Sequence, residues 1–170
     1  NEIKRKCRRD SIPSLLYMGL PSEQKGFTDM VNAFYIAKKS IKNLKLIIAD
    51  SHIRKNTEEY YKQLVYDSSI LIKDKIAREI ELSKAWIYIY PMRSPQNTMA
   101  VPLSLVESAK IGTAFISTAV GGIPEIVPGQ FLVPPASSNA LARKIVELIK
   151  DYPKKIALKI KPNNKQIIAK

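Results

Sequence analysis

Short apolar runs alternate with longer segments of helical periodicity along most of this chain. The apolar runs lie at 14–18, 44–49, 69–72, 85–90, 114–118 and 131–133. Each run is bounded by proline, glycine or polar residues, which is typical of short buried strands. Their apolar character is continuous rather than alternating, so they predict strands that are covered on both faces.

The segments between these runs predict helices. The clearest lies at 26–40, where Phe27, Met30 and Phe34 recur at helical spacing and the lysines fall on the opposite face. We expect further helices at 57–66 capped by Thr57, at 74–83 opened by Asp74, from Pro102 onward, and from a Ser138 cap to a point before Pro153. Glu79 and Glu81 are expected to face solvent.

This alternation of strands and helices determines the expected fold class. Parallel strands need a crossover to return the chain, and helices of ten to fifteen residues supply it. We therefore expect an α/β protein, a Rossmann-like three-layer sandwich with a parallel sheet of about six strands. One domain is expected at 13–152, between a basic lead segment at 1–12 and a basic C-terminal segment at 153–170.

The composition excludes several classes of protein. With 45% hydrophobic and 25% charged residues, the 170-residue chain can build a core and is not disordered as a whole. No apolar run approaches the roughly 20 residues of a membrane-spanning helix. One cysteine, Cys7, and one histidine, His52, are too few for a cysteine and histidine zinc site. We interpret His52 as a surface-loop residue rather than a ligand.

The formal net charge of +13 raises the question of an anionic partner. Residues 1–9 hold five basic residues against one acidic residue, and residues 151–170 hold six lysines against one aspartate. Because the ends carry most of the charge, nucleic acid is a minor alternative as a partner, while an anionic membrane surface would suit the ends. We expect a piece of a longer protein in the cytoplasm, with a membrane-peripheral location as the alternative.

Candidate chemistry is expected in the loops that follow the strands, because ligands of open parallel sheets bind at the carboxyl ends of the strands. In 19–26, glycine allows close backbone approach and Lys25 could meet a phosphate. The helix from Pro102 offers free N–H groups at Leu103 and Ser104. The patterns GxxxxGK[ST] and GxGxxG do not occur. An ordinary surface lysine and a tight glycine turn stay as alternatives.

Three segments occur together and in this order: Gly19 followed by Lys25-Gly26, Pro-Leu-Ser-Leu-Val-Glu at 102–107, and Gly-Gly-Ile-Pro-Glu-Ile-Val at 121–127. In this combination they resemble the C-terminal domain of group 1 glycosyltransferases (glycosyltransferase family 4, GT-B fold). The resemblance spans about 13–152. It implies a domain that holds a nucleotide diphosphate sugar against an N-terminal acceptor domain, which this chain lacks.

The resemblance also implies roles for particular residues. Lys25 would neutralise the donor diphosphate together with the amides of Leu103 and Ser104, and Glu107 would bind the ribose hydroxyls. The other donor-binding positions implied are Gly19, Gly26, Thr118, Gly121 and Gly122. It names no catalytic residue. No metal or cofactor is implied, because a lysine and helix amides can offset the diphosphate charge.

Two positions depart from the family pattern. Leu20 stands where the family has an arginine, and Met99 stands where it has a glutamate eight positions before Glu107. These changes remove a cation near the diphosphate and an acceptor for sugar hydroxyls. The leading interpretation is the donor-binding part of a hexosyltransferase, inactive as an isolated piece. The alternative is a degenerate glycosyltransferase-like module that binds without catalysis.

Overall fold

The strands form one parallel sheet. A computed structural model describes residues 9–50, 61, 64, 66–74, 76–97 and 102–151. The strands are β1 (Ser14–Met18), β2 (Lys45–Ala49), β3 (Ile70–Lys73), β4 (Ile87–Tyr90), β5 (Ala114–Thr118) and β6 (Leu132–Val133). They pair in the order β3-β2-β1-β4-β5-β6, and every pair is parallel. The predicted α/β class with a six-stranded parallel sheet is confirmed.

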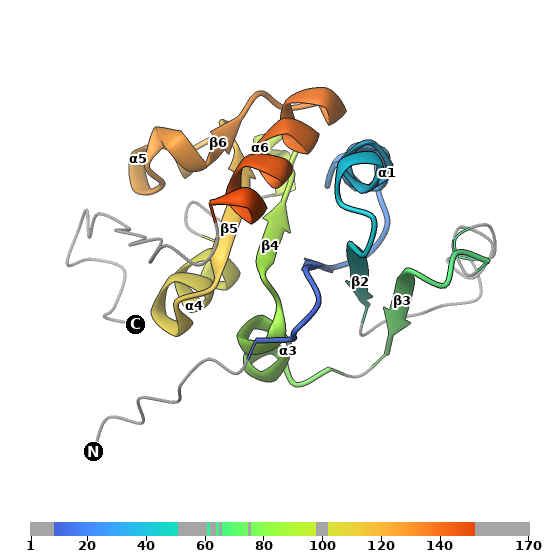
Figure 1. Cartoon of the computed structure of the whole chain (residues 1–170). Coiled ribbons are helices and arrows are strands. Elements are labelled where there is room, and N and C mark those ends of the chain that lie inside the picture. Colours follow the sequence, from blue (N-terminus) through green and yellow to red (C-terminus); the bar gives the residue numbers. More distant parts are fainter. Residues whose placement is uncertain are drawn as a thin grey trace, which may run out of the picture.

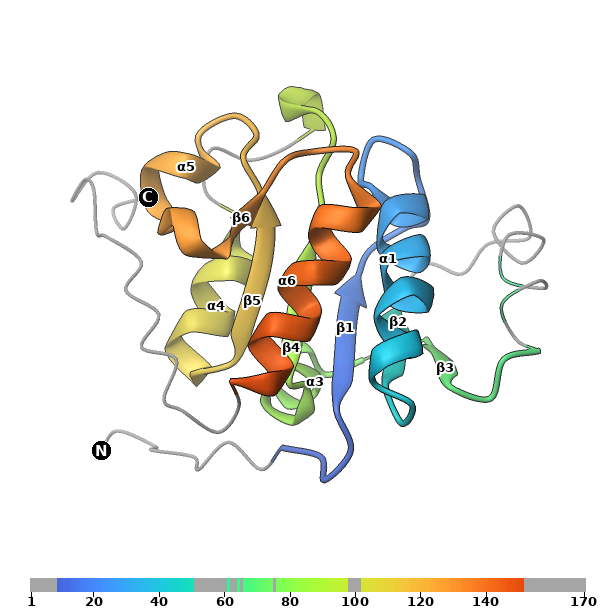
Figure 2. The same ribbon diagram turned by 45° about the horizontal axis from the view of Figure 1, so that its top comes forward.

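Helices cover both faces of this sheet. They are α1 (Phe27–Ser40), α3 (Arg78–Lys84), α4 (Leu103–Ile111), α5 (Ile123–Ile126) and α6 (Ser138–Lys150), with 3-10 turns at η1 (Pro95–Asn97) and η2 (Gly129–Phe131). Helices α1 and α6 pack side by side on one face, and α3 and α4 lie together on the other (Figures 1 and 2). The result is the three-layer sandwich that the sequence predicts.

The continuous apolar runs are explained by this double cover. Successive side chains of a strand point to opposite faces, yet Leu15 and Leu16 of β1 are both fully buried. In β5 all five residues are buried. Burial of one such aliphatic side chain stabilises the fold by about 1.5–3 kcal/mol. The core therefore consists of two layers of side chains, one on each face of the single sheet.

Gly26 joins the start of α1 to the segment after β4. Its φ of +66° lies in the left-handed region. A Cβ built on Gly26 would lie 1.8 Å from the carbonyl oxygen of Pro91. Glycine is required here for both reasons, and the contact fixes the loop after β1 against the chain that leaves β4.

The structure corrects two expectations around α3. The helix begins at Arg78 rather than at Asp74. Strand β3 runs on to Lys73, whose carbonyl accepts a hydrogen bond from the Asp50 N–H, so Asp74 follows the strand directly. Glu81 does not face solvent: it is 7% exposed, and its carboxylate lies 2.7 Å from Lys73 Nζ.

The cap of α6 lies one residue before the expected one. Ser137 is the N-cap, and its hydroxyl oxygen accepts a hydrogen bond from the Ala140 N–H at 3.4 Å. Ser138 is the first helical residue instead. Its hydroxyl lies 3.4 Å from Asp29 Oδ1 of α1, which leaves it unavailable as the cap.

Several expectations fall outside the described residues. They are the cap at Thr57 and most of the helix at 57–66, the surface position of His52, and Met99. Of the predicted helix the structure describes Tyr61, which is helical and buried, and Leu64 and Tyr66, which lie in turns, so the helix does not extend to Tyr66 as expected. In the described ranges, no helix has the length and apolar character needed to cross a membrane.

We predict that Gly26→Ala lowers the free energy of unfolding by about 2–5 kcal/mol, because left-handed strain adds to the overlap with Pro91. Gly112→Ala is the matched control, since Gly112 has a φ of +84° but nothing within 4 Å of its added Cβ. The control should cost only the backbone strain, about 1–2 kcal/mol. Urea unfolding at 25 °C measures both, and equal losses would contradict the close contact at Gly26.

Candidate functional site

The strand order creates a place for a ligand between β1 and β4. From β1 the chain builds β2 and β3 in one direction, and from β4 it builds β5 and β6 in the other. The loops that leave β1 and β4 therefore separate at the carboxyl edge of the sheet, where open α/β sheets bind ligands. In Figure 2 this is the upper edge, toward which the arrowheads of β1 and β5 point.

Lys25 lies in the loop between β1 and α1. Its N–H donates to the hydroxyl oxygen of Ser22 at 3.2 Å, and its side chain makes no ion pair with any residue in the described ranges. A Cβ added to Gly19 would lie 3.6 Å from Lys25 Nζ. The ammonium group thus folds back over the Gly19 backbone, where it can neutralise an anion.

The N-terminus of α4 presents two backbone donors at the same edge. The N–H groups of Leu103 and Ser104 precede the first hydrogen bond of this helix, which Leu105 donates to the Pro102 carbonyl. The Ser104 hydroxyl oxygen accepts a hydrogen bond of 2.9 Å from the Tyr88 phenol on β4. Burial raises the pKa of Tyr88, so the phenol keeps the proton that it donates.

Glu107 lies one turn further along α4, with a side chain that is 34% exposed. Its carboxylate lies 3.4 Å from Arg78 Nη1, at the first residue of α3. An exposed pair of this length contributes little to stability. It does place a cation beside the carboxylate that the resemblance assigns to the ribose, and the two carboxylate oxygens retain acceptor capacity for a diol.

Thr118 is the last residue of β5, and the two glycines lie in the turn that follows this strand. Thr118 is 3% exposed, and its hydroxyl donates a 2.6 Å hydrogen bond to the Met92 carbonyl. The structure therefore gives Thr118 a structural partner that ties β5 to the segment after β4. Gly121 is exposed with a φ of +55°, and Gly122 is the N-cap of α5. The backbone of this turn is accessible, whereas the Thr118 side chain is buried beneath it.

Leu20 occupies the position where the family arginine is expected. Its side chain is 39% exposed, and its carbonyl accepts a hydrogen bond of 2.9 Å from the Tyr17 phenol. Burial raises the pKa of Tyr17, which keeps this phenol a neutral donor. The backbone of the loop is held in place, but the Leu20 side chain brings no charge to the edge.

Sequence reasoning missed Arg93, which follows β4. Its guanidinium contacts both oxygens of Asp29, at 2.6 and 2.9 Å, and Glu23 Oε2 at 2.6 Å. These hydrogen bonds, those to Asp29 first, raise the pKa of Arg93. The signal available was Asp29 itself, a carboxylate near the apolar stripe of α1, which is 6% exposed and needs a partner.

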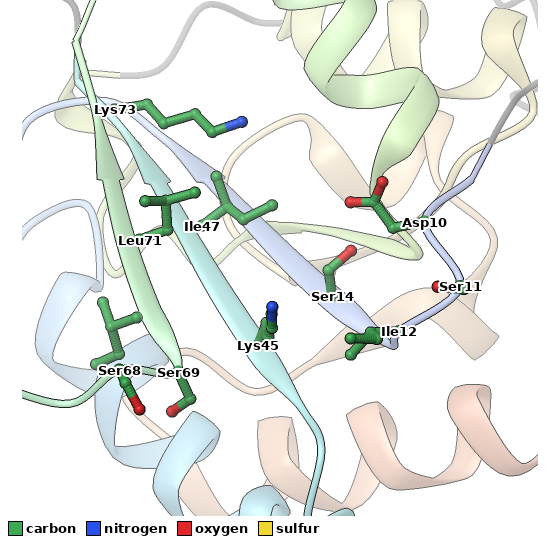
Figure 3. A pocket seen from close by; sticks show the side chains of 11 residues that line it. Asp10, Ser11, Ile12, Ser14, Lys45, Ile47, Ser68, Ser69, Leu71 and Lys73 are labelled. Atoms are coloured by element: carbon green, nitrogen blue, oxygen red, sulfur yellow. The ribbon is translucent and has the colours of Figure 1, made fainter.

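A separate hollow of about 420 Å³ lies elsewhere on the domain (Figure 3). Its lining includes Ser14, Lys45 and Ile47, together with the segment 10–12 and part of β3. None of the predicted site residues lines it. The Ser14 hydroxyl is buried there without a hydrogen-bond partner in the described part of the chain. The candidate site is therefore the edge between β1 and β4, not this hollow.

Acidic, cysteine and histidine side chains do not gather at either place. Within the ranges that the structure describes, no three of them are arranged to hold a metal ion. The chemistry that the edge can offer is a free ammonium group, a pair of backbone N–H groups and one carboxylate. This combination suits a ligand with an anionic part and vicinal hydroxyl groups.

Comparison with known structures identifies the fold. The C-terminal domain of the group 1 glycosyl transferase LpcC from Francisella tularensis is 21% identical, with a TM-score of 0.66, over 86% of this chain and 87% of that one. The pneumococcal O-GlcNAc transferase GtfA, in complex with UDP and GlcNAc, is 20% identical with a TM-score of 0.70, over 88% of this chain and 31% of that one.

A third structure is Anabaena Alr3699/HepE in complex with UDP-glucose. It is 17% identical with a TM-score of 0.71, over 85% of this chain and 41% of that one. The present chain thus spans less than half the length of these last two proteins. The fold is the Rossmann-like half of a GT-B fold.

Comparison with the curated proteins finds no significant match. The family model described as "Glycosyl transferases group 1" matches residues 12–151, which is most of the chain. The matched region contains the loop with Lys25, the start of α4 and the glycine turn after β5. By this match and by its fold, the chain belongs to the group 1 glycosyltransferases.

Proposed function

We propose that this chain is the donor-binding domain of an enzyme that transfers a hexose from a nucleotide diphosphate sugar to an acceptor. The observation that carries the proposal is the ammonium group of Lys25 at the β1 and β4 switch point, which makes no ion pair with the residues that the structure describes, in a chain of this family. Two of the similar structures hold UDP together with a sugar or UDP-glucose. Both findings support a UDP sugar as the first donor to test.

The donor would lie across the carboxyl edge with each part facing a different group. The diphosphate faces Lys25 and the N–H groups of Leu103 and Ser104, and the ribose hydroxyls face Glu107. When the bond between sugar and phosphate breaks, negative charge grows on the diphosphate. A fixed cation and fixed amide dipoles stabilise that charge, so these groups assist departure of the diphosphate. The proposal invokes no metal ion.

The acceptor belongs to another part of the enzyme in this proposal. The chain spans only 31% and 41% of two of the similar proteins, so an N-terminal acceptor domain is the expected partner. We place the enzyme in the cytoplasm, with its basic ends suited to an anionic membrane surface. The second candidate is a module that binds nucleotide sugars without catalysis, and the exposed, uncharged Leu20 favours it.

We expect Glu107→Ala to weaken binding of UDP at least about tenfold, because hydrogen bonds to a charged group contribute about 1.5–3 kcal/mol. Met99→Ala removes a side chain that offers no comparable hydrogen bond, so it should weaken binding less. Glu147→Ala on α6 is the control, since Glu147 is also an exposed glutamate in an ion pair. Calorimetric titration with UDP, GDP and ADP measures all three variants, and an unchanged affinity in Glu107→Ala would exclude the ribose contact.

The departure at Met99 gives a gain-of-function test. Met99→Glu restores an acceptor for sugar hydroxyls, so it should strengthen binding of the nucleotide sugar about threefold to tenfold while the bare nucleotide is unaffected. Titration of UDP-glucose against UDP in the same variant measures the difference. If sugar and bare nucleotide respond alike, the methionine does not face the sugar.

Lys25→Met should weaken nucleotide binding about tenfold at low salt, since it removes the one unpaired side-chain cation that the structure describes in the loop after β1. The loss should shrink as salt rises, because mobile ions screen the same charge. Lys39→Met, at the last turn of α1, is the control. Dissociation constants at 0.05 M and 0.5 M NaCl provide the test, and a loss independent of salt would contradict charge neutralisation.

The domain alone should transfer no sugar, because it lacks the groups that orient the acceptor. Proximity and orientation contribute about 7–11 kcal/mol to such reactions. Product formation from UDP-glucose, with the chain alone and with the complete enzyme, is the measurement. Sustained transfer by the 170-residue chain would show that it does not need a separate acceptor domain.

A further inference from the structure

We propose that Arg93 is a positioning residue for donor binding, which holds the loop carrying Lys25 in its binding conformation. The inference rests on the proposed function for the consequence in binding, but its structural basis is independent of it. Arg93 lies after β4, whereas Glu23 belongs to the loop after β1 and Asp29 belongs to α1. One guanidinium thus joins three segments at the edge where the nucleotide would lie.

The contacts of Arg93 form a clamp rather than a single surface ion pair. Nε and Nη2 contact the two oxygens of Asp29 at 2.6 and 2.9 Å, and Nη1 contacts Glu23 at 2.6 Å. The Asp29 side chain is only 8% exposed, so its carboxylate depends on this partner. The planar guanidinium is suited to such a set of directed bonds, which a lysine could not reproduce.

The backbone strengthens the same connection. The Arg93 N–H donates a 2.9 Å hydrogen bond to the carbonyl of Gln24. Gly26 packs against the Pro91 carbonyl, with no room for a Cβ between them. Lys25 therefore lies between two residues that are both held by the segment after β4. Among the described residues the Lys25 side chain has no ion-pair partner, while its backbone is held in place on both sides.

This arrangement has a consequence for affinity. A lysine side chain is flexible, and ordering a flexible loop on binding weakens the binding. The Arg93 clamp orders the Lys25 backbone before the ligand arrives. A direct role for Arg93 on the diphosphate is the competing explanation, but all three of its side-chain nitrogens already contact carboxylates. The positioning role is the one that these contacts favour.

The test uses two variants that disturb the clamp in different ways. Arg93→Lys keeps the charge but cannot hold both carboxylates at once. Glu23→Gln removes the charge of the outer contact and leaves only a neutral acceptor for Arg93, and Glu23 is 68% exposed, so the fold should persist. Glu147→Gln is the matched control, because Glu147 is 55% exposed and paired with Lys144 on α6.

We expect Arg93→Lys and Glu23→Gln each to weaken UDP binding about threefold to tenfold, with little change for uridine. For Glu23→Gln the direction of the change in UDP affinity decides between the two explanations. Removal of a carboxylate near an anion site should strengthen UDP binding by charge alone, whereas loss of the clamp should weaken it. Both losses should disappear in a Lys25→Met background. Stronger binding in Glu23→Gln, or equal losses with and without Lys25, would overturn the proposal.

Backbone amide hydrogen exchange without any nucleotide separates this proposal from the proposed function. Exchange at residues 22–27 should rise about tenfold in both clamp variants, and the middle of α6 should be unaffected. If wild type binds none of UDP, GDP and ADP, the proposed function fails and the role in binding fails with it, while faster exchange still establishes the clamp. Unchanged exchange at 22–27 overturns the clamp whatever binds.

Discussion

The parallel pairing of β1 with β4 is the constraint on which the rest of the domain depends. It places Leu15 beside Ile87 and Leu16 beside Tyr88 at the centre of the sheet. Strands then extend outward on both sides, and right-handed crossovers bring α1 to one face and α3 and α4 to the other. The separation of the two loops at the carboxyl edge follows from this pairing alone.

Most of the fold could be predicted because it depends on patterns that are local in sequence. An apolar run between turn residues defines each strand, and its continuity shows that both faces are covered. The errors lie where a distant contact decides a boundary or the environment of a charge. The Asp50 N–H extends β3 to Lys73, and Lys73 forms an ion pair with Glu81 of α3. Neither contact has a signature in the local spacing.

The candidate site likewise contains features that the local sequence predicts and features that depend on distant contacts. Gly26 and the donors at Leu103 and Ser104 follow from backbone requirements, so sequence could locate them. The pairs of Arg93 with Asp29 and of Arg78 with Glu107 join residues 64 and 29 positions apart. No periodicity relates such residues, and only the folded chain brings them together. The charged surroundings of this edge are thus a property of the fold, even where its backbone donors are a property of the sequence.

The lengths of the outer strands have a consequence for the behaviour of the domain in solution. Edge strands carry unpaired N–H and C=O groups that can recruit another extended chain. Here β6 has two residues and β3 has four, and β3 ends at a lysine. A second chain would find too few consecutive groups for a stable ladder at either edge. In the part of the chain that the structure describes, both edges of the sheet are therefore poor templates for aggregation.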